Sequence, residues 1–221
     1  MKIFIDTASI DEIKKWKKRL FIDGVTTNQK IFLSEKGVNF KQRVLEICNE
    51  EIGDVSIELT TYGVGKMVTE AREYASWHKN IVIKVPMTTD GSGLEVVKRL
   101  KTYGIKTNAT CMMTAEQLIL AANAGATYVS LFYNRSKDSG EDADEELRKT
   151  KHFISSKQRF SVKAAKIIAG SIRYPSDVSD AFYAGADIVT ITPKILEAIM
   201  DNKKTAETIK EFDEAWVEFK K

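Results

Sequence analysis

The stretch Ile-Val-Ile-Lys-Val-Pro at residues 81–86 decides the fold of this 221-residue chain. It is a short β-branched run closed by a proline, which is typical of a buried strand. Similar segments rich in isoleucine, valine and threonine recur, mostly separated by stretches with helical periodicity. The eight candidate strands span residues 2–7, 24–28, 54–59, 80–86, 106–111, 126–132, 165–172 and 186–193. Eight alternating units predict an α/β fold with a closed parallel sheet, the (β/α)8 TIM barrel.

Prolines and a repeated tripeptide support this strand count. The three prolines, at 86, 175 and 193, each fall at or just after a proposed strand end, where the sheet no longer needs a backbone N–H. Ala-Gly-Ala occurs at 124–126 and 184–186, each time where a helix should stop, and glycine suits a helix C-terminus.

An open doubly wound sheet is the alternative fold, because it also alternates strands and helices. Its usual phosphate-binding fingerprint is missing from this chain. Gly-Val-Gly-Lys at 63–66 lacks a third glycine in register, and Met67 stands where a P-loop needs serine or threonine. The barrel is therefore favoured.

The domain organisation is predicted to be simple. No low-complexity linker or shift in composition occurs, so residues 1–221 are expected to form a single TIM-barrel domain. A C-terminal helix is predicted at about 203–221, where apolar residues repeat at spacings of three and four: Ile209, Phe212, Trp216 and Phe219. Such a stripe must be buried, either on its own barrel or on another subunit, and we expect a homo-oligomer.

Composition excludes several classes of function. Lysine and arginine number 34 against 31 acidic residues, which argues against a nucleic-acid or membrane-surface partner. Cys48 and Cys111 form no close-spaced pair, and His78 and His152 add no cluster with metal-ligand spacing. We therefore expect a reducing compartment, no metal and no cofactor.

No export signal is visible, since Asp6 stands where a signal peptide needs its apolar stretch. A cytoplasmic location is therefore expected. The longest uncharged run, residues 117–134, is interrupted by Asn123, Gly125 and Thr127. It is predicted to be a helix end followed by a strand, with no membrane partner.

Polar residues fall at the carboxyl end of nearly every predicted strand. Side chains at these ends converge on one mouth of a barrel, where active sites lie. Any one of them could merely brace a loop, but all of them together indicate a site: Asp6, Thr26, Asn28, Glu58, Lys84, Asn108, Thr110, Arg135, Ser171 and Arg173.

Lys84 carries the strongest signal, because its ammonium lies inside an apolar strand, where desolvation favours the neutral, nucleophilic amine. A salt-bridged structural lysine is the alternative. Asp6 and Glu58 could provide that pairing, or they could transfer protons in Schiff-base chemistry.

The chain resembles the small transaldolases, the group that also contains fructose-6-phosphate aldolase. The resemblance extends from Phe-Ile-Asp-Thr-Ala at 4–8 to Thr-Pro-Lys-Ile-Leu at 192–196. Its motifs are Asp-Gly-Val-Thr-Thr-Asn at 23–28, Val-Ser-Ile-Glu at 55–58, Ile-Lys-Val-Pro at 83–86, Lys-Thr-Asn-Ala-Thr at 106–110 and Ala-Gly-Ser-Ile-Arg at 169–173.

The resemblance implies a Schiff base between Lys84 and a ketose phosphate, with transfer of a dihydroxyacetone unit to an aldose phosphate. Asp6 would remove the proton from the C4 hydroxyl, and Glu58 and Thr110 would hold a proton-shuttling water. Asn28 and Asn108 would orient substrate hydroxyls and the lysine, and Arg135, Ser171 and Arg173 would clamp the phosphate. The implied substrate contacts are Thr26, Asn28, Asn108, Phe132, Arg135, Ser171 and Arg173.

Phe132 and Glu58 favour transfer, because the related aldolases carry tyrosine and glutamine at these places. Resembling proteins form rings of subunits, which implies a decamer or pentamer. Gln29 and Lys30 replace the family's usual Pro-Ser, and Leu131 replaces a proline. The extra cation leaves a modified anionic sugar open as substrate. A lyase that releases dihydroxyacetone, a sugar-phosphate isomerase and a non-catalytic sugar-phosphate-binding barrel also stay open.

Overall fold

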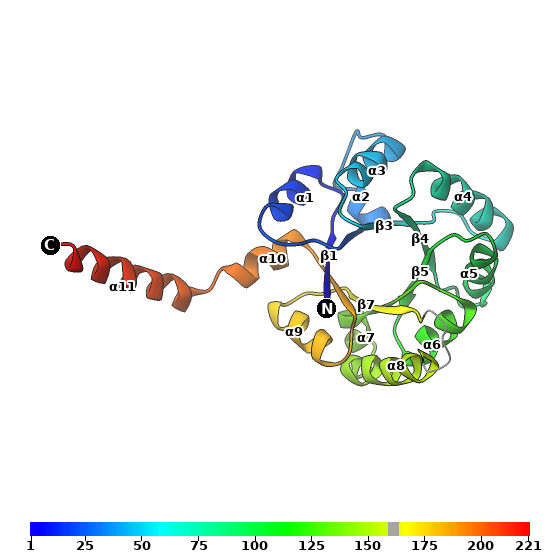
Figure 1. Ribbon diagram of the computed structural model, residues 1–221. Helices are drawn as coiled ribbons and strands as arrows, with labels where there is room; N and C mark the ends of the chain where they lie inside the picture. Colours follow the sequence, from blue (N-terminus) through cyan, green and yellow to red (C-terminus); the bar gives the residue numbers. More distant parts are fainter. Residues whose placement is uncertain (159–163) are drawn as a thin grey trace.

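A closed barrel of eight parallel strands in sequence order forms the centre of the protein (Figure 1). The computed structural model describes residues 1–158 and 164–221. The strands are β1 Lys2–Asp6, β2 Gly24–Thr26, β3 Asp54–Glu58, β4 Ile81–Pro86, β5 Thr107–Met112, β6 Tyr128–Phe132, β7 Lys166–Gly170 and β8 Ile188–Ile191. β1 pairs in parallel with β8, which closes the sheet. The barrel prediction is confirmed and the open-sheet alternative is wrong.

Helices surround this sheet and cover its outer face, apart from the last helix, α11, which lies away from it (Figure 1). They are α1 Ile10–Lys17, α2 Gln29–Phe32, α3 Phe40–Asn49, α4 Val64–Trp77, α5 Ser92–Thr102, α6 Ala115–Ala124, α7 Tyr133–Asp138, α8 Ala143–Gln158, α9 Pro175–Tyr183, α10 Pro193–Met200 and α11 Lys203–Phe219. The uncharged run at 117–134 contains the end of α6, all of β6 and the start of α7, as expected. Within the described residues, no helix has the length and apolar character to cross a bilayer.

The barrel interior changes from apolar to polar toward the mouth along several strands. A small inner core contains Phe4, Val82, Tyr128, Ile168 and Ile188, separate from the large core between the sheet and the helices. Successive strand residues point to opposite faces, so the residue two positions after an inward one also points inward. Val82 therefore places Lys84 inside the barrel, nearer the mouth.

Gly24 lets the barrel close tightly around Phe4. A Cβ at this position would lie 2.6 Å from the Phe4 ring and 2.7 Å from the backbone oxygen of Asp54. Both approaches are too short for any other residue type, because the second contact is with backbone that cannot turn aside. Glycine is thus required where β2 passes between β1 and β3.

A buried carboxylate fixes the loop that follows β3. Glu70 of α4 accepts hydrogen bonds from the backbone and hydroxyls of Thr60 and Thr61 and from the hydroxyl of Tyr74. Burial alone would raise the Glu70 pKa, but these hydrogen bonds outweigh it and lower the pKa below its ordinary value. The loop directly after Glu58 is thereby held in place.

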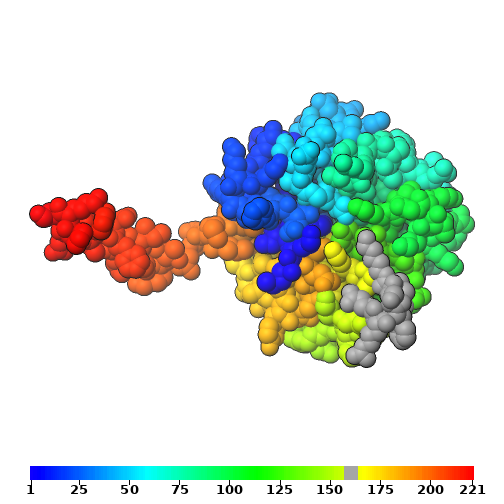
Figure 2. All heavy atoms as spheres, viewed as in Figure 1, coloured from blue at the N-terminus to red at the C-terminus, as the bar shows by residue number. Residues whose placement is uncertain are grey.

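The last helix, α11, lies away from the barrel and joins it through α10 (Figures 1 and 2). No residue of α11 is buried, and the stripe residues Ile209, Phe212, Trp216 and Phe219 are between 55% and 78% exposed. Trp216 and Phe219 stack on each other with ring centroids 5.3 Å apart. The stripe therefore does not pack on its own barrel.

Candidate active site

A cavity of about 380 Å³ opens at the carboxyl ends of the strands. It is lined by residues from most of the strands and the loops that follow them, as convergence in a closed barrel requires. The lining consists of Asp6, Thr26, Asn28, Lys30, Ile31, Ser34, Lys84, Asn108, Thr110, Ser130, Phe132, Arg135, Gly170, Ser171 and Thr190. All the residues predicted for the site are among them except Glu58 and Arg173.

Lys84 is buried at the base of this cavity, with only 5% of its surface exposed. Its Nζ donates a hydrogen bond of 3.1 Å to the Thr27 carbonyl oxygen and lies 3.4 Å from Glu58 Oε2. Glu58 and Lys84 are register partners on β3 and β4, which explains why they meet. The pairing that the sequence left open therefore includes Glu58, although Glu58 does not line the cavity.

Asp6 occupies a different environment at the end of β1. The hydroxyl of Thr26 donates to its carboxylate at 2.5 Å, and Thr26 also shares a hydrogen bond with Thr190. Burial raises the pKa of Asp6 above its ordinary value, although the charge of Lys84 and the hydrogen bond from Thr26 act in the opposite direction. A carboxylate with a raised pKa is a stronger proton acceptor, which suits a general base.

Buried polar side chains continue across β3, β5 and β6. Asn108 donates to Ser56 Oγ at 3.3 Å and accepts from Ser130 Oγ at 2.7 Å. Asn108 is therefore locked into the sheet beside its register partner Lys84. Nearby, the buried hydroxyl of Thr110 makes no hydrogen bond to any described residue. It lines the cavity and is available to a bound molecule.

The expected phosphate clamp is only partly assembled in the cavity. Arg135 is exposed, lines the cavity and lies over the Phe132 ring, 5.1 Å from its centroid. Ser171 also lines the cavity and has a left-handed backbone with φ 58°. Arg173, by contrast, forms a bidentate ion pair with Asp138, with distances of 2.9 and 2.5 Å. Its guanidinium is directed to that carboxylate.

The sequence reasoning missed several lining residues, among them Ser130 and Thr190 on the strands. Each is a polar residue inside an otherwise apolar strand, in Tyr-Val-Ser-Leu-Phe at 128–132 and Ile-Val-Thr-Ile at 188–191. The same signal marked Lys84. It could have identified both of them.

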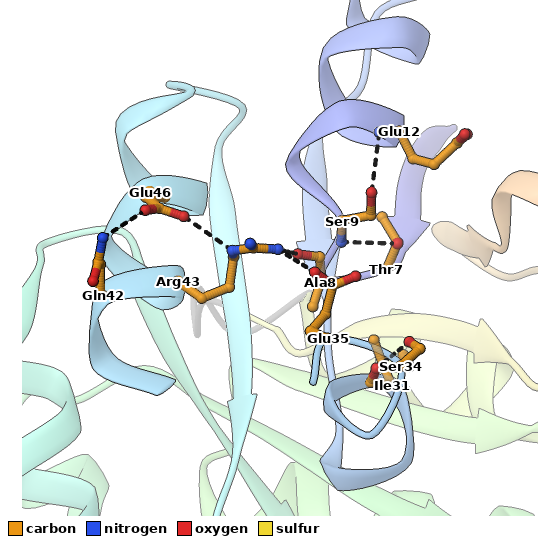
Figure 3. Close-up of polar contacts among 10 residues, drawn as sticks. All are labelled: Thr7, Ala8, Ser9, Glu12, Ile31, Ser34, Glu35, Gln42, Arg43 and Glu46. Atoms are coloured by element: carbon orange, nitrogen blue, oxygen red, sulfur yellow. Dashed lines mark hydrogen bonds and ion pairs between the residues drawn. The ribbon is translucent and has the colours of Figure 1, made fainter. Parts of the chain in front are cut away.

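Across the mouth from Arg135 and Ser171, Arg43 of α3 links the segments that follow β1 and β2 (Figure 3). The Arg43 guanidinium donates to the Ala8 carbonyl at 2.9 Å and forms ion pairs with Glu35 and with Glu46. Ala8 belongs to the loop after β1, and Glu35 to the segment after α2. Arg43 therefore braces the segments that follow Asp6 and Lys30 in sequence.

Lys30 is an exposed cation on this rim. It lines the cavity and has no ion-pair partner among the described residues. Gln29 beside it donates to the Leu59 carbonyl at 2.8 Å, which ties the start of α2 to the end of β3. Since β2 and β6 are opposite each other in a ring of eight strands, Lys30 and Arg135 lie on opposite sides of the mouth.

The structure brings a buried lysine and two carboxylates together at the mouth of a (β/α)8 barrel. This arrangement is typical of enzymes with this fold. The family model for transaldolase/fructose-6-phosphate aldolase matches residues 3–221, so the chain belongs to this family.

Individual relatives are similar in sequence over all or nearly all of the chain. A probable transaldolase of Caldicellulosiruptor saccharolyticus is 43% identical over 98% of this chain and 97% of its own. One from Streptococcus agalactiae is 41% identical over the full length of both chains. Probable transaldolase 1 of Bacillus cereus is 39% identical over 98% of this chain and 97% of its own.

Proposed function

We propose that this protein is a transaldolase that carries a dihydroxyacetone unit on Lys84. The observation that supports this most directly is the buried Lys84 amine, 3.4 Å from the Glu58 carboxylate, at the base of a polar cavity. The relatives named probable transaldolases are consistent with it. No cofactor takes part in the proposed reaction.

The first half-reaction breaks a carbon–carbon bond. The Lys84 amine attacks the C2 carbonyl of a ketose phosphate, and loss of water gives an iminium ion. Glu58, which is paired with Lys84, and the free hydroxyl of Thr110 are suited to hold the water that moves these protons. Asp6 then takes the proton of the C4 hydroxyl, and the electrons of the C3–C4 bond move into the iminium. An aldose phosphate leaves, and an enamine of dihydroxyacetone remains on Lys84.

The second half-reaction reverses these steps with a different aldehyde. The enamine carbon attacks the carbonyl of an acceptor aldose phosphate, and Asp6 returns its proton to the new hydroxyl. Water then hydrolyses the iminium and frees Lys84. The proposed phosphate contacts are Arg135 and Ser171, with Arg173 able to join them by leaving the exposed carboxylate of Asp138.

Phe132 supports transfer over simple release of dihydroxyacetone. Its ring lines the cavity, with its centroid 6.0 Å from Lys84 Nζ. A phenyl ring neither donates nor accepts a proton, so it cannot activate a water beside the enamine. The bound unit should therefore persist until an acceptor arrives.

A modified sugar with a second anionic group is the second candidate substrate class. Lys30 and Arg135 face the cavity from opposite rims, and neither has an acidic partner within residues 1–158 and 164–221. A ketose phosphate held by its phosphate at Arg135 would direct its other end toward Lys30. A second negative group at that end would be favoured there.

We also infer that the chain forms a homo-oligomer, a pentamer or a decamer, through α11. Four large apolar side chains on one face of α11 are more than half exposed. Contiguous apolar surface of this kind is typical of subunit interfaces. A second copy of the chain is the expected occupant.

The Schiff base predicts a covalent adduct. Reduction with borohydride in the presence of fructose 6-phosphate should leave a stable mass increase on the peptide that contains Lys84. Lys84→Met should abolish the adduct, whereas Lys98→Met, which changes an exposed lysine on α5, should retain it. Mass spectrometry of digested protein measures both. An unmodified wild-type Lys84 with every ketose phosphate offered would rule out this mechanism.

Phe132→Tyr should convert part of the transfer into release. The new hydroxyl would sit near Lys84 and supply a proton-transfer group, so release of free dihydroxyacetone from fructose 6-phosphate without acceptor should rise about tenfold or more. Phe132→Leu is the matched control and should not increase release. If wild-type protein already releases dihydroxyacetone as fast as it transfers it, the lyase assignment replaces the transferase assignment.

Lys30→Gln should selectively weaken binding of doubly anionic ketoses. An exposed ion pair contributes up to about 1 kcal/mol, so the inhibition constant of fructose 1,6-bisphosphate should rise about three- to fivefold. The Michaelis constant of fructose 6-phosphate should change less than about twofold. Lys36→Gln, on the same exposed segment but outside the cavity lining, is the control. Equal weakening of both sugars would show that Lys30 acts through general charge alone.

Assembly through α11 predicts a light-scattering mass of five or ten times 24.9 kDa at micromolar concentration. Replacing Phe212 and Trp216 by lysine should lower this mass, because charge on the apolar stripe disfavours its burial. Glu214→Lys on the same helix is the control and should leave the mass unchanged. A wild-type mass near that of one chain would refute the assembly.

A further inference from the structure

A buried carboxylate lies behind the phosphate end of the cavity without lining it. Asp177, in the first turn of α9, is only 3% exposed. One of its oxygens, Oδ2, accepts three hydrogen bonds: from the backbone N–H of Arg173 at 2.9 Å, from that of Tyr174 at 2.8 Å and from Asn134 Nδ2 at 2.7 Å. Lys137 Nζ lies 3.8 Å from the other oxygen.

Helix capping explains only one of these contacts. Asp177 is the third residue of α9, and a carboxylate at that position commonly accepts from the backbone N–H of the residue before the helix, here Tyr174. The bonds from Arg173 and Asn134 extend beyond a cap. Asn134 belongs to α7, a different element that follows β6.

Asn134 carries the connection directly to a cavity-lining residue. Its Nδ2 also donates to the Ser171 carbonyl at 2.9 Å, and its backbone N–H donates to the same oxygen at 3.4 Å. Asn134 immediately precedes Arg135 in sequence. The segment after β6, which contains Arg135, and the segment after β7, which contains Ser171, are therefore tied together through Asp177 and Asn134.

This tie opposes relaxation of an uncommon backbone conformation. Ser171 has a positive φ of 58°, which residues other than glycine adopt only when their surroundings enforce it. Hydrogen bonds at Ser171 and just after it hold this conformation. Asn134 donates to the Ser171 carbonyl, and Asp177 accepts from the backbone N–H groups of Arg173 and Tyr174.

We propose that Asp177 is the positioning residue of the substrate-phosphate site. It keeps Arg135 and Ser171 at a fixed separation through the carboxylate–amide link to Asn134. The inference rests on the proposed function, since it assumes that a phosphate binds between these two residues. Lys84 and Asp6 lie on β4 and β1, so the covalent chemistry does not depend on this link.

If Asp177 has this role, its removal should weaken the binding of ligands that carry phosphate and of no others. Asp177→Ala should raise the KM for fructose 6-phosphate and the inhibition constant of inorganic phosphate about tenfold, with kcat within about threefold of wild type, because three hydrogen bonds that hold the site are lost. Borohydride trapping of dihydroxyacetone, which has no phosphate, should change less than about twofold. Asp177→Asn should lie between wild type and alanine, since its amide oxygen still accepts hydrogen bonds.

Asp180→Ala, an exposed carboxylate on the same helix, is the matched control and should leave both constants unchanged. Asn134→Ala removes the link while keeping the α9 cap, and should reproduce the phosphate-specific loss even if Asp177→Ala does not fold. Equal losses with dihydroxyacetone and phosphate ligands, or no loss with Asn134→Ala, would overturn the role. Failure of wild-type protein to trap dihydroxyacetone would instead reject the proposed function.

Discussion

Pairing of β1 with β8 is the constraint on which the rest of the structure depends. It closes the sheet, so every strand has two hydrogen-bonded neighbours and all the carboxyl ends face one mouth. Thr26 and Thr190, which are 164 positions apart in sequence, share a hydrogen bond of 2.6 Å only because of this closure. Asp6, Thr26, Thr190 and Lys84 then line one small cavity, and Glu58 is paired with Lys84 from the neighbouring strand.

The two carboxylates near Lys84 differ because their surroundings differ. Glu58 is the cross-strand neighbour of Lys84 and forms the ion pair that offsets the cost of burying an ammonium group. Asp6 has a hydroxyl partner and a raised pKa that results mainly from burial. One lysine with two unlike carboxylates supplies the separate proton-transfer groups that the proposed chemistry requires.

Each rim of the mouth is stabilised by a charged residue that does not line the cavity. Arg43 joins the segments after β1 and β2, whereas Asp177 joins the segments after β6 and β7. Such bridges restrict loops that otherwise have few packing constraints. The base of the cavity is fixed by the sheet, and its rims are fixed by these side chains.

The sequence by itself determined the barrel and most of the cavity. Alternating segments identified all eight strands, and polar interruptions such as Lys84 and Asn108 identified inward-facing residues, because strand periodicity is a local property. Only the tertiary structure decided that Glu58 pairs with Lys84, that Arg173 turns to Asp138, and that Asp177 links two loops. These contacts join residues on different elements, and their partners depend on strand register and loop direction, which no local pattern encodes.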